Sequence, residues 1–336
     1  MINKLIIAFL LVSNAVFGQR PGSQLSDTLN LIEFVDKHFI DHDIDNYSLR
    51  LFTNYKSKSF RIRSGDYMAS YTPNNRYGLG VGFANSKLLI DIAFNIKGNE
   101  DEVTKRFDMQ GTTFVGKKNY LNFYLQTYKG FTVKNNFGAP SVFRDDIKSI
   151  TVGFNTLHTF SDIEYSYGML KAGLYRLDKK VYIKGGVGGF CFYDYFSAEG
   201  NVLPENSDVY FNEDARIKRY NSGSIGVLGG VLSIIKLTDN MLFACNIMPG
   251  VGGVYKHETL ENNDSKTSGD FLLKTDYTMA LGYNSSRFYI SLIYGGGVYV
   301  SDLGNDNHYA FNLTKAKFAI GYKLSRTTKS SKSTQY

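Results

Sequence analysis

The sequence contains no tryptophan, two cysteines and only five prolines in 336 residues. Beyond position 18 it also lacks any apolar run of the roughly twenty residues that a transmembrane helix requires. Its mean hydropathy of −0.23 is too low for a bundle of such helices. These absences exclude a helical membrane protein.

Tyrosine, phenylalanine and glycine are abundant instead, with 25, 25 and 33 residues respectively. Tyrosine and phenylalanine favour β-strands, and glycine-rich strands suit a crowded barrel wall. The hydrophobic fraction of 43% fits a wall whose two faces alternate between apolar and polar. The composition therefore favours an all-β protein.

The stretch 271–294 shows this alternation most clearly. From Phe271 to Tyr283 the odd positions are mostly apolar or aromatic, whereas the even positions include Lys274 and Asp276. Successive side chains of a strand point to opposite faces, so the pattern predicts a strand with one apolar and one polar face. We interpret the apolar face as facing lipid and the polar face as facing a lumen.

Residues 1–18 have the features of a secretory signal peptide. A basic start is followed by an apolar run over 5–16 and by the small residue Gly18. A single membrane anchor is the weaker alternative, because the run is short and no stop-transfer charges follow it. We expect cleavage before Gln19.

Residues 19–46 differ from the rest of the chain and predict a periplasmic or plug segment with one short amphipathic helix. Their run Asp-His-Asp-Ile-Asp at 41–45 resembles a set of metal ligands, but a solvated turn is the preferred interpretation. At the other end, residues 325–336 form a basic tail rich in Ser and Thr.

Residues 47–324 read as a series of strands separated by turns and long polar loops. We expect a closed antiparallel transmembrane β-barrel of about fourteen strands, or about twelve, each about ten residues long. Closure is required because an open sheet edge leaves backbone groups unpaired in lipid. A soluble all-β protein is the alternative, but the minor faces hold glycines and scattered charges rather than a second core surface.

The expected loops do not all fall at one end of this barrel. The segments 196–218, 257–269 and 301–308 fall together, whereas 134–146 falls at the opposite end. Either a strand between 147 and 193 is split or fused, or 134–146 is a long periplasmic turn. Strands over 60–71 and 163–176 are among those expected.

The alternation assigns individual side chains to the two faces. The polar positions assigned to the lumen are Asp91, Asn95, Asn122, Tyr124, Gln126, Lys274 and Asp276. The apolar positions assigned to lipid are Leu79, Val81, Phe83, Ile90, Ile92, Phe94, Leu273, Met279, Leu281, Ile290 and Leu292.

The two cysteines, Cys191 and Cys245, both lie in apolar stretches with the strand pattern. A disulfide requires Cα atoms less than about 7 Å apart, and the expected strand order places another strand between them. We therefore expect two unpaired, lipid-facing thiols that behave as small apolar residues.

No motif predicts catalysis, a cofactor or a bound metal. The glycine runs 185–189 and 250–253 lack the following helix and the Lys and Ser/Thr of a phosphate-binding loop, so we place them on an inner face or at strand bends. His257 beside Glu258 and His308 near Asp306 suggest a remote alternative, a hydrolase sited at the barrel rim. No spacing fixes a triad, and we predict that the protein is not an enzyme.

The formal net charge of +7 does not predict a nucleic-acid partner, because Lys and Arg are scattered and no recognition motif occurs. Contact with anionic outer-membrane lipid or glycolipid is the milder interpretation. The expected partners are therefore these lipids, the barrel-assembly machinery that inserts such proteins, and a small polar solute.

Several short motifs resemble, in their order, a family of Bacteroidetes-type outer-membrane proteins catalogued as a domain of unknown function. They are Tyr71-Thr72-Pro73-Asn74, Leu79-Gly80-Val81-Gly82, Tyr128-Lys129-Gly130-Phe131, Ser222-Gly223-Ser224, Ala280-Leu281-Gly282-Tyr283-Asn284 and Ala319-Ile320-Gly321-Tyr322-Lys323-Leu324. The resemblance implies an outer-membrane barrel over about 47–324 and implies no chemistry. The chain departs from the pattern over 160–193 and in closing its last strand on Leu324 rather than an aromatic residue.

Together these patterns predict a barrel in the outer membrane of a Gram-negative cell, with two possible roles. One is a pore for small polar solutes, and the other is a non-conducting barrel for surface structure, recognition or assembly. The roles differ in whether side chains fill the bore, and a barrel of intermediate strand number allows either.

Overall fold

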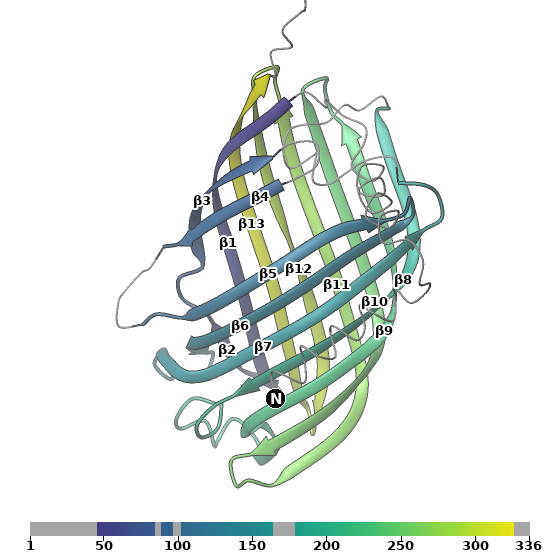
Figure 1. Ribbon diagram of the computed structural model, residues 1–336. Coiled ribbons are helices and arrows are strands. Elements are labelled where there is room, and N and C mark those ends of the chain that lie inside the picture. The colour runs from purple at the N-terminus through teal and green to yellow at the C-terminus, as the bar shows by residue number, and fades with distance from the viewer. Residues whose placement is uncertain (1–45, 85–88, 97–101, 164–178, 326–336) are drawn as a thin grey trace, which may run out of the picture. The chain divides into compact units, whose positions relative to one another are not determined.

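The computed structural model describes residues 46–84, 89–96, 102–163 and 179–325 (Figure 1). The predicted signal peptide, the segment 19–45 with its 41–45 run, and the tail 326–336 lie outside these residues. Within them, no helix is long and apolar enough to cross a membrane.

Thirteen antiparallel strands make up one continuous sheet. A single short 3-10 helix, η1, occurs in the described chain. The strands are β1 (Asn46–Ser64), β2 (Tyr67–Thr72), β3 (Tyr77–Ala84), β4 (Leu89–Asn95), β5 (Lys105–Val115), β6 (Asn119–Asn135), β7 (Val142–Thr159), β8 (Val181–Ser197), β9 (Ile217–Lys236), β10 (Met241–Leu260), β11 (Ser265–Asn284), β12 (Phe288–Gly304) and β13 (Asn307–Ser325), and η1 spans Glu213–Ala215.

Ten of these strands close into a ring, which confirms the predicted all-β, closed antiparallel barrel. The first strand, β1, pairs with β13 along its whole length, from Asn46 opposite Ser325 to Ser64 opposite Asn307. The short strand β2 completes the ring, because it pairs with β1 at one edge and with β6 at the other. We expected about fourteen strands or about twelve; the described residues form ten in the ring and three outside it.

The three strands outside the ring divide one part of the wall. β3 lies along the first half of β1, and β4 pairs with β3. β5 pairs with β6 on the other side. Among the described residues, β4 and β5 have no second partner, so the wall has a split between them, which Figure 1 shows as diverging strands. The split begins where Pro73 to Arg76 interrupt the run from β2 into β3, with Asn75 in the left-handed region at φ 53°.

The ring strands, apart from β2, have 17 to 20 residues and are longer than the ten expected. Most of the predicted polar loops 257–269 and 301–308 belong to strands, because β10 and β11 are separated by a turn at Asn263, and β12 and β13 by a turn at Asn305 and Asp306. These residues have positive φ, a conformation that Asn and Asp tolerate. The predicted strand 60–71 is broken in the same way at Gly65, with φ 53°.

β7 pairs directly with β8, from Lys148 opposite Ser197 to Thr159 opposite Gly186. A strand over 163–176 therefore does not separate them in the wall, and most of that range lies outside the described residues. Without this extra strand, the connections 136–141 and 198–216 fall at the same end of the barrel. The conflict in the expected loop positions is thereby removed.

Candidate functional site

The barrel interior is the candidate site, and its two halves differ. Near the end that carries the loop 198–216, aromatic rings fill the bore. We call these rings the aromatic plug; its members are Phe60, Tyr71, Phe131, Phe196, Tyr220 and Tyr309, and each is at most 2% exposed. Phe60 stacks on Tyr71 at a centroid distance of 4.2 Å, and Phe196 stacks on Tyr220 at 4.9 Å. Rings from β1, β2, β6, β8, β9 and β13 thus meet across the bore.

The loop 198–216 closes the same end over the plug. Its residues Val202, Leu203 and Phe211 are buried. The Tyr71 hydroxyl donates to the carbonyl of Val202 at 2.9 Å. The Arg144 guanidinium pairs with Asp146 and also donates to the carbonyl of Leu203 at 3.3 Å. This mouth is therefore covered by the chain's own residues.

A fully buried ion pair lies against the plug. The Lys58 ammonium is 2.5 Å from an oxygen of Asp194, and neither side chain is exposed. Lys58 also donates to the Ser149 hydroxyl. The hydroxyls of Thr151 and Tyr309 each donate to Asp194 at 2.6 Å. A buried charge pair is tolerated only when such additional bonds satisfy its remaining lone pairs and protons.

A second buried ion pair joins Lys274 and Asp276, whose charged atoms are 2.6 Å apart. Asn155 bridges them, accepting from Lys274 at 2.7 Å and donating to Asp276 at 2.9 Å. The Tyr299 hydroxyl donates to Asp276 at 2.9 Å and shares a hydrogen bond of 3.1 Å with Tyr124. Three residues assigned to the lumen from the sequence, Tyr124, Lys274 and Asp276, thus belong to one interior network.

The remaining lumen positions lie apart from this network. Gln126 is buried and donates to Asp108 at 2.7 Å, and Asp108 in turn pairs with Lys56 at 2.9 Å. Asn122 is half-buried and lines the cavity described next. The structure does not describe the side chains of Asp91 and Asn95.

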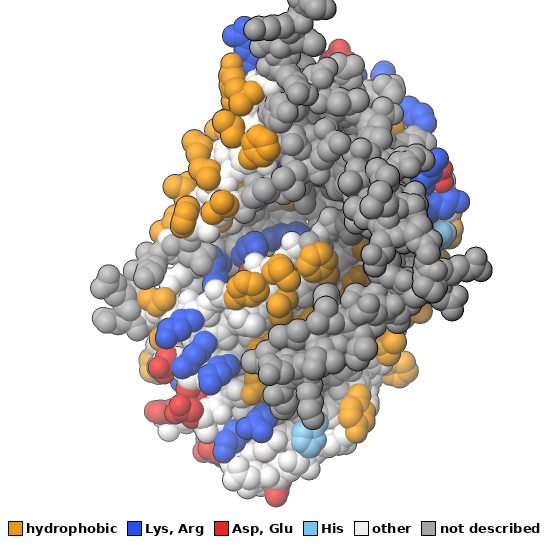
Figure 2. Space-filling view, in the orientation of Figure 1, with side chains coloured by type: hydrophobic (Ala, Val, Ile, Leu, Met, Phe, Trp, Pro, Cys, Tyr) orange, Lys and Arg blue, Asp and Glu red, His pale blue; other side chains and the backbone are white. Residues whose placement is uncertain are grey.

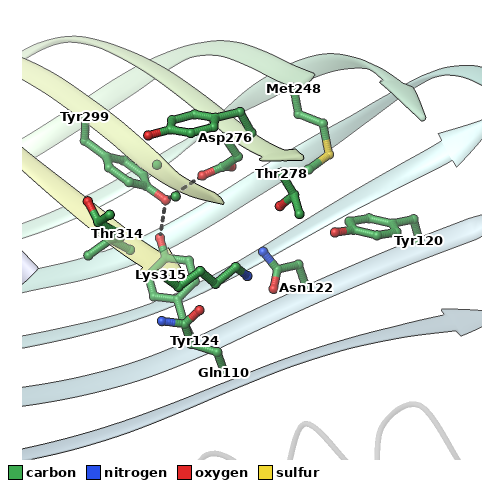
Figure 3. A pocket seen from close by; sticks show the side chains of 14 residues that line it. Gln110, Tyr120, Asn122, Tyr124, Met248, Asp276, Thr278, Tyr299, Thr314 and Lys315 are labelled. Carbon is green, nitrogen blue, oxygen red and sulfur yellow. Dashed lines mark hydrogen bonds between the residues drawn. The ribbon is translucent and has the colours of Figure 1, made fainter. Parts of the chain in front are cut away.

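The other half of the interior contains a small cavity, of about 30 Å³ available to the centres of water-sized spheres, that is partly open to solvent (Figure 3). Its lining includes Gln110 of β5, Asn122 of β6, Thr278 of β11 and Lys315 of β13. Figure 3 shows Lys315 extending from β13 into this cavity. No hydrogen bond or salt bridge joins its ammonium to any side chain that the structure describes.

Reasoning from the sequence missed Lys56, Lys58, Asp194 and Lys315, although each lies on the inner face. Lys58 has the same parity as Phe60, and Lys315 the same parity as Phe311. Because aromatic rings fill the interior, these strands do not present a purely polar inner face. Phe318, Ile320 and Tyr322 are apolar residues at even positions of β13, which predicts that its even positions face outward and its odd positions face inward. This alternation is the signal that would have found Lys315.

The residues assigned to lipid from the sequence lie on the outer surface wherever the structure describes them. Phe83 and Ile290 are half-buried there, and the side chain of Ile90 lies outside the described residues. The exposed members are Leu79, Val81, Ile92, Phe94, Leu273, Met279, Leu281 and Leu292.

The cysteines, glycine runs and histidines considered as possible reactive or binding groups do not come together in one site. Both cysteines are free, as predicted, and β9 lies between their strands. The two glycine runs lie within β8 and β10 rather than before a helix. His158 contacts Asn119 and His257 contacts Thr267, both on exposed sites. The described residues contain no group of three or more His, Cys, Asp or Glu that could hold a metal.

Three solved structures illustrate what a structural comparison finds similar to this chain. The outer membrane protease OmpT from Escherichia coli is 8% identical, with 85% of this chain and 99% of that chain covered and a TM-score of 0.36. The outer membrane protein OprG from Pseudomonas aeruginosa is 12% identical, with 84% and 98% covered and a TM-score of 0.23. The Pseudomonas putida toluene transporter TodX is 6% identical, with 84% and 90% covered and a TM-score of 0.22. At these identities and TM-scores the likenesses assign no activity to this chain.

A protein-family model matches residues 34–324, a range that includes all thirteen strands except Ser325, the last residue of β13. Its description reads Domain of unknown function (DUF4421). A search of curated proteins finds no match to the chain.

Proposed function

The chain belongs to the family described as Domain of unknown function (DUF4421), and that description names no activity. From the geometry alone, we propose that the protein is a non-catalytic outer-membrane barrel whose bore does not conduct. The predicted resemblance to a family of unknown function is confirmed by the match. Of the two roles expected from the sequence, the filled interior favours the non-conducting barrel.

The single observation that carries this proposal is the aromatic plug with its buried ion pair. Plug rings from six strands are at most 2% exposed, and Lys58 and Asp194 are not exposed at all. A solute or hydrated ion passing through the bore would have to displace these rings and break a satisfied charge pair. Breaking such a pair costs several kcal/mol, about 3–5 when one partner is lost.

The outer surface supports placement in a membrane. From Phe271 to Tyr283 the exposed face of β11 is apolar apart from Thr275. At about 3.3 Å per residue and a tilt of about 45°, this face spans about 28 Å along the membrane normal, close to the apolar band of about 25 Å in such barrels.

The chain ends and the connections divide between the two ends of the barrel. Both ends of the described barrel chain, Asn46 and Ser325, pair with each other, and short turns at 237–240 and 285–287 lie at the same end. The long loop 198–216 lies at the opposite end. The connection between β7 and β8, 160–180, is as long and lies at the end with Asn46, so loop length alone does not set the orientation. We propose that the chain ends face the periplasm, so that the plug and its loop lie toward the cell surface. Membrane lipid and the assembly machinery remain its proposed partners.

A liposome-swelling assay with a small neutral sugar tests the closed bore. Liposomes containing the full-length protein are expected to swell no faster than empty liposomes. Replacing two plug residues, Phe196→Ala with Tyr309→Ala, removes rings from the bore and is expected to permit swelling. Phe318→Ala with Tyr322→Ala, two exposed aromatic residues of β13, is the matched control. Rapid swelling with the unmodified protein would contradict the proposal.

A further inference from the structure

We propose that the half of the interior behind the split binds an amphiphile with one acidic headgroup and an alkyl tail, taken from the membrane between β4 and β5. This inference rests on the barrel lying in a membrane, but not on the bore being closed. We call the site the cationic compartment; its inward-facing basic side chains are Arg50, Lys56, Arg106, Lys315 and Lys317.

The split is held open at its base by specific contacts. The Arg106 guanidinium of β5 donates to the carbonyl of Lys56 in β1 at 2.8 Å and to that of Arg76 at 3.3 Å. The backbone N–H of Asn74 donates to the Thr104 hydroxyl at 2.7 Å, and this hydroxyl donates to the carbonyl of Gly130 at 2.7 Å. These bonds join the two arms of the wall where they diverge. The split is therefore a built feature of the fold.

Both arms of the split present apolar side chains on the outside. Ile92 and Phe94 of β4 are 55% and 70% exposed, and Phe107 and Met109 of β5 are 55% and 45% exposed. Figure 2 shows a hollow in this face, with Lys and Arg side chains within it and hydrophobic side chains on either side. Apolar rims around a basic interior match the two parts of an anionic amphiphile.

We expect an anionic ligand because of the charge of one residue, Lys315. Lys56 and Lys315 lie directly opposite each other in the register of β1 and β13, and like charges so placed destabilise a strand pair. Lys56 is compensated by Asp108 at 2.9 Å. Lys274 and Asp276 neutralise each other. Lys315 has no such partner in the described chain, so an acidic headgroup beside it would offset the repulsion.

The depth of Lys315 favours an amphiphile over a free anion. Its pairing partner on β12 is Gly295, next to the exposed Tyr294 and close to the exposed Leu292. Lys315 therefore lies at the level of the apolar outer belt. A headgroup can reach it by sliding between the arms while its tail stays against the apolar rims. A charge in surroundings of low dielectric constant is also bound more strongly than one in water.

Fluorescence titration of the full-length protein in neutral detergent tests this site, with 11-(dansylamino)undecanoic acid as the probe. Saturable binding is expected for the unmodified protein. Lys315→Gln removes a charge-assisted bond and is expected to weaken binding about tenfold or more. Lys315→Arg keeps the charge and is expected to retain binding. Lys129→Gln removes an exposed lysine of β6 and is expected to leave it unchanged.

Competition identifies which part of the ligand matters. Palmitate is expected to displace the probe, whereas hexadecanol, acetate and inorganic phosphate at the same concentration are not. Equal displacement by hexadecanol would show an apolar surface without an anion site, and displacement by phosphate would show a free-anion site. Either result overturns the proposal, as does unchanged affinity in folded Lys315→Gln, with folding judged by the shift between unheated and heated gels. Rapid sugar uptake by liposomes would overturn the closed bore and leave this binding result standing.

Discussion

At the scale of single residues, inner-face glycines decide where the interior rings lie. Tyr124 lies opposite Gly153, Tyr289 opposite Gly321, and Phe52 opposite Gly80 in the strand registers. A Cβ atom added to these glycines would lie 2.1, 2.1 and 2.4 Å from the facing ring. Each ring therefore occupies the space that a neighbouring side chain would take. Such pairs allow a narrow barrel to hold many aromatic residues inside.

Gly153→Ala is expected to destabilise the barrel by about 1–3 kcal/mol, because overpacking a filled interior forces a ring from its position. The ring in question is Tyr124, whose hydroxyl is held by Tyr299, so it cannot move without losing that bond. Gly223→Ala is the control, since nothing lies within 4 Å of the added Cβ. Urea unfolding in detergent micelles measures both. Equal stability of the two variants would contradict the packing described.

A pH effect is expected in the turn after β10. Asn201 donates to Glu261 at 3.0 Å, and the Arg216 guanidinium lies 2.7 Å from the same carboxylate. The hydrogen bond from Asn201, and then the charge of Arg216, lower the pKa of Glu261. Because the pKa is lowered, the contact favours the ionised carboxylate. Its stabilisation of the loop is complete at pH values above the ordinary glutamate pKa, about 4.3. This stabilisation is lost as the pH falls through the lowered pKa.

Carbon-13 NMR titration of the Glu261 carboxyl tests this effect. The midpoint in the unmodified protein is expected below the ordinary glutamate value, and Asn201→Ala is expected to raise it. The effect on overall stability is expected to be small, because the side chains are substantially exposed. A midpoint at or above the ordinary value would show that the loop contacts do not form in solution.

At the scale of the strand, alternation was a reliable guide where one face meets lipid. The period-two pattern over 271–294 predicted strands that the structure contains as β11 and β12. It underestimated their length, because strand ends such as Ser265 to Asp270 are polar on both faces and read as loops. It also missed much of the interior, since Tyr309 and Phe311 are apolar and buried beside Lys58.

The split had no signal in the local sequence. Whether β2 joins β6 depends on pairing between residues 69–72 and 132–135, far apart in the chain. Periodicity identifies the faces of a strand but not its neighbours. The strand count expected from the sequence differed from the observed one for the same reason.

Arginine substitution on the two faces of β11 separates their environments. Leu281→Arg is expected to impair insertion, because arginine near the middle of the membrane costs about 2–4 kcal/mol on the lipid side. Thr278→Arg is expected to have a smaller effect, since Thr278 lines the interior cavity. Heat-modifiable mobility on gels, after folding into liposomes, measures the inserted fraction. Equal impairment at the two positions would contradict the assigned faces.

At the scale of the whole molecule, the barrel combines a closed half with an open one. Aromatic rings, the buried pair of Lys58 and Asp194, and the loop 198–216 fill the half toward the proposed cell surface. The split wall and the cationic compartment occupy the half toward the chain ends. We propose that a barrel of this form obstructs passage through the membrane while giving its interior sideways access to lipid.

Single-channel recording in planar bilayers tests the closed bore most directly. The full-length protein, inserted at a known density, is expected to give no discrete conductance steps in concentrated potassium chloride. The variant carrying Phe196→Ala and Tyr309→Ala is expected to give steps, which would show that the recording detects an opened bore. Reproducible, long-lived steps with the unmodified protein would contradict the closed barrel and restore the pore as its function.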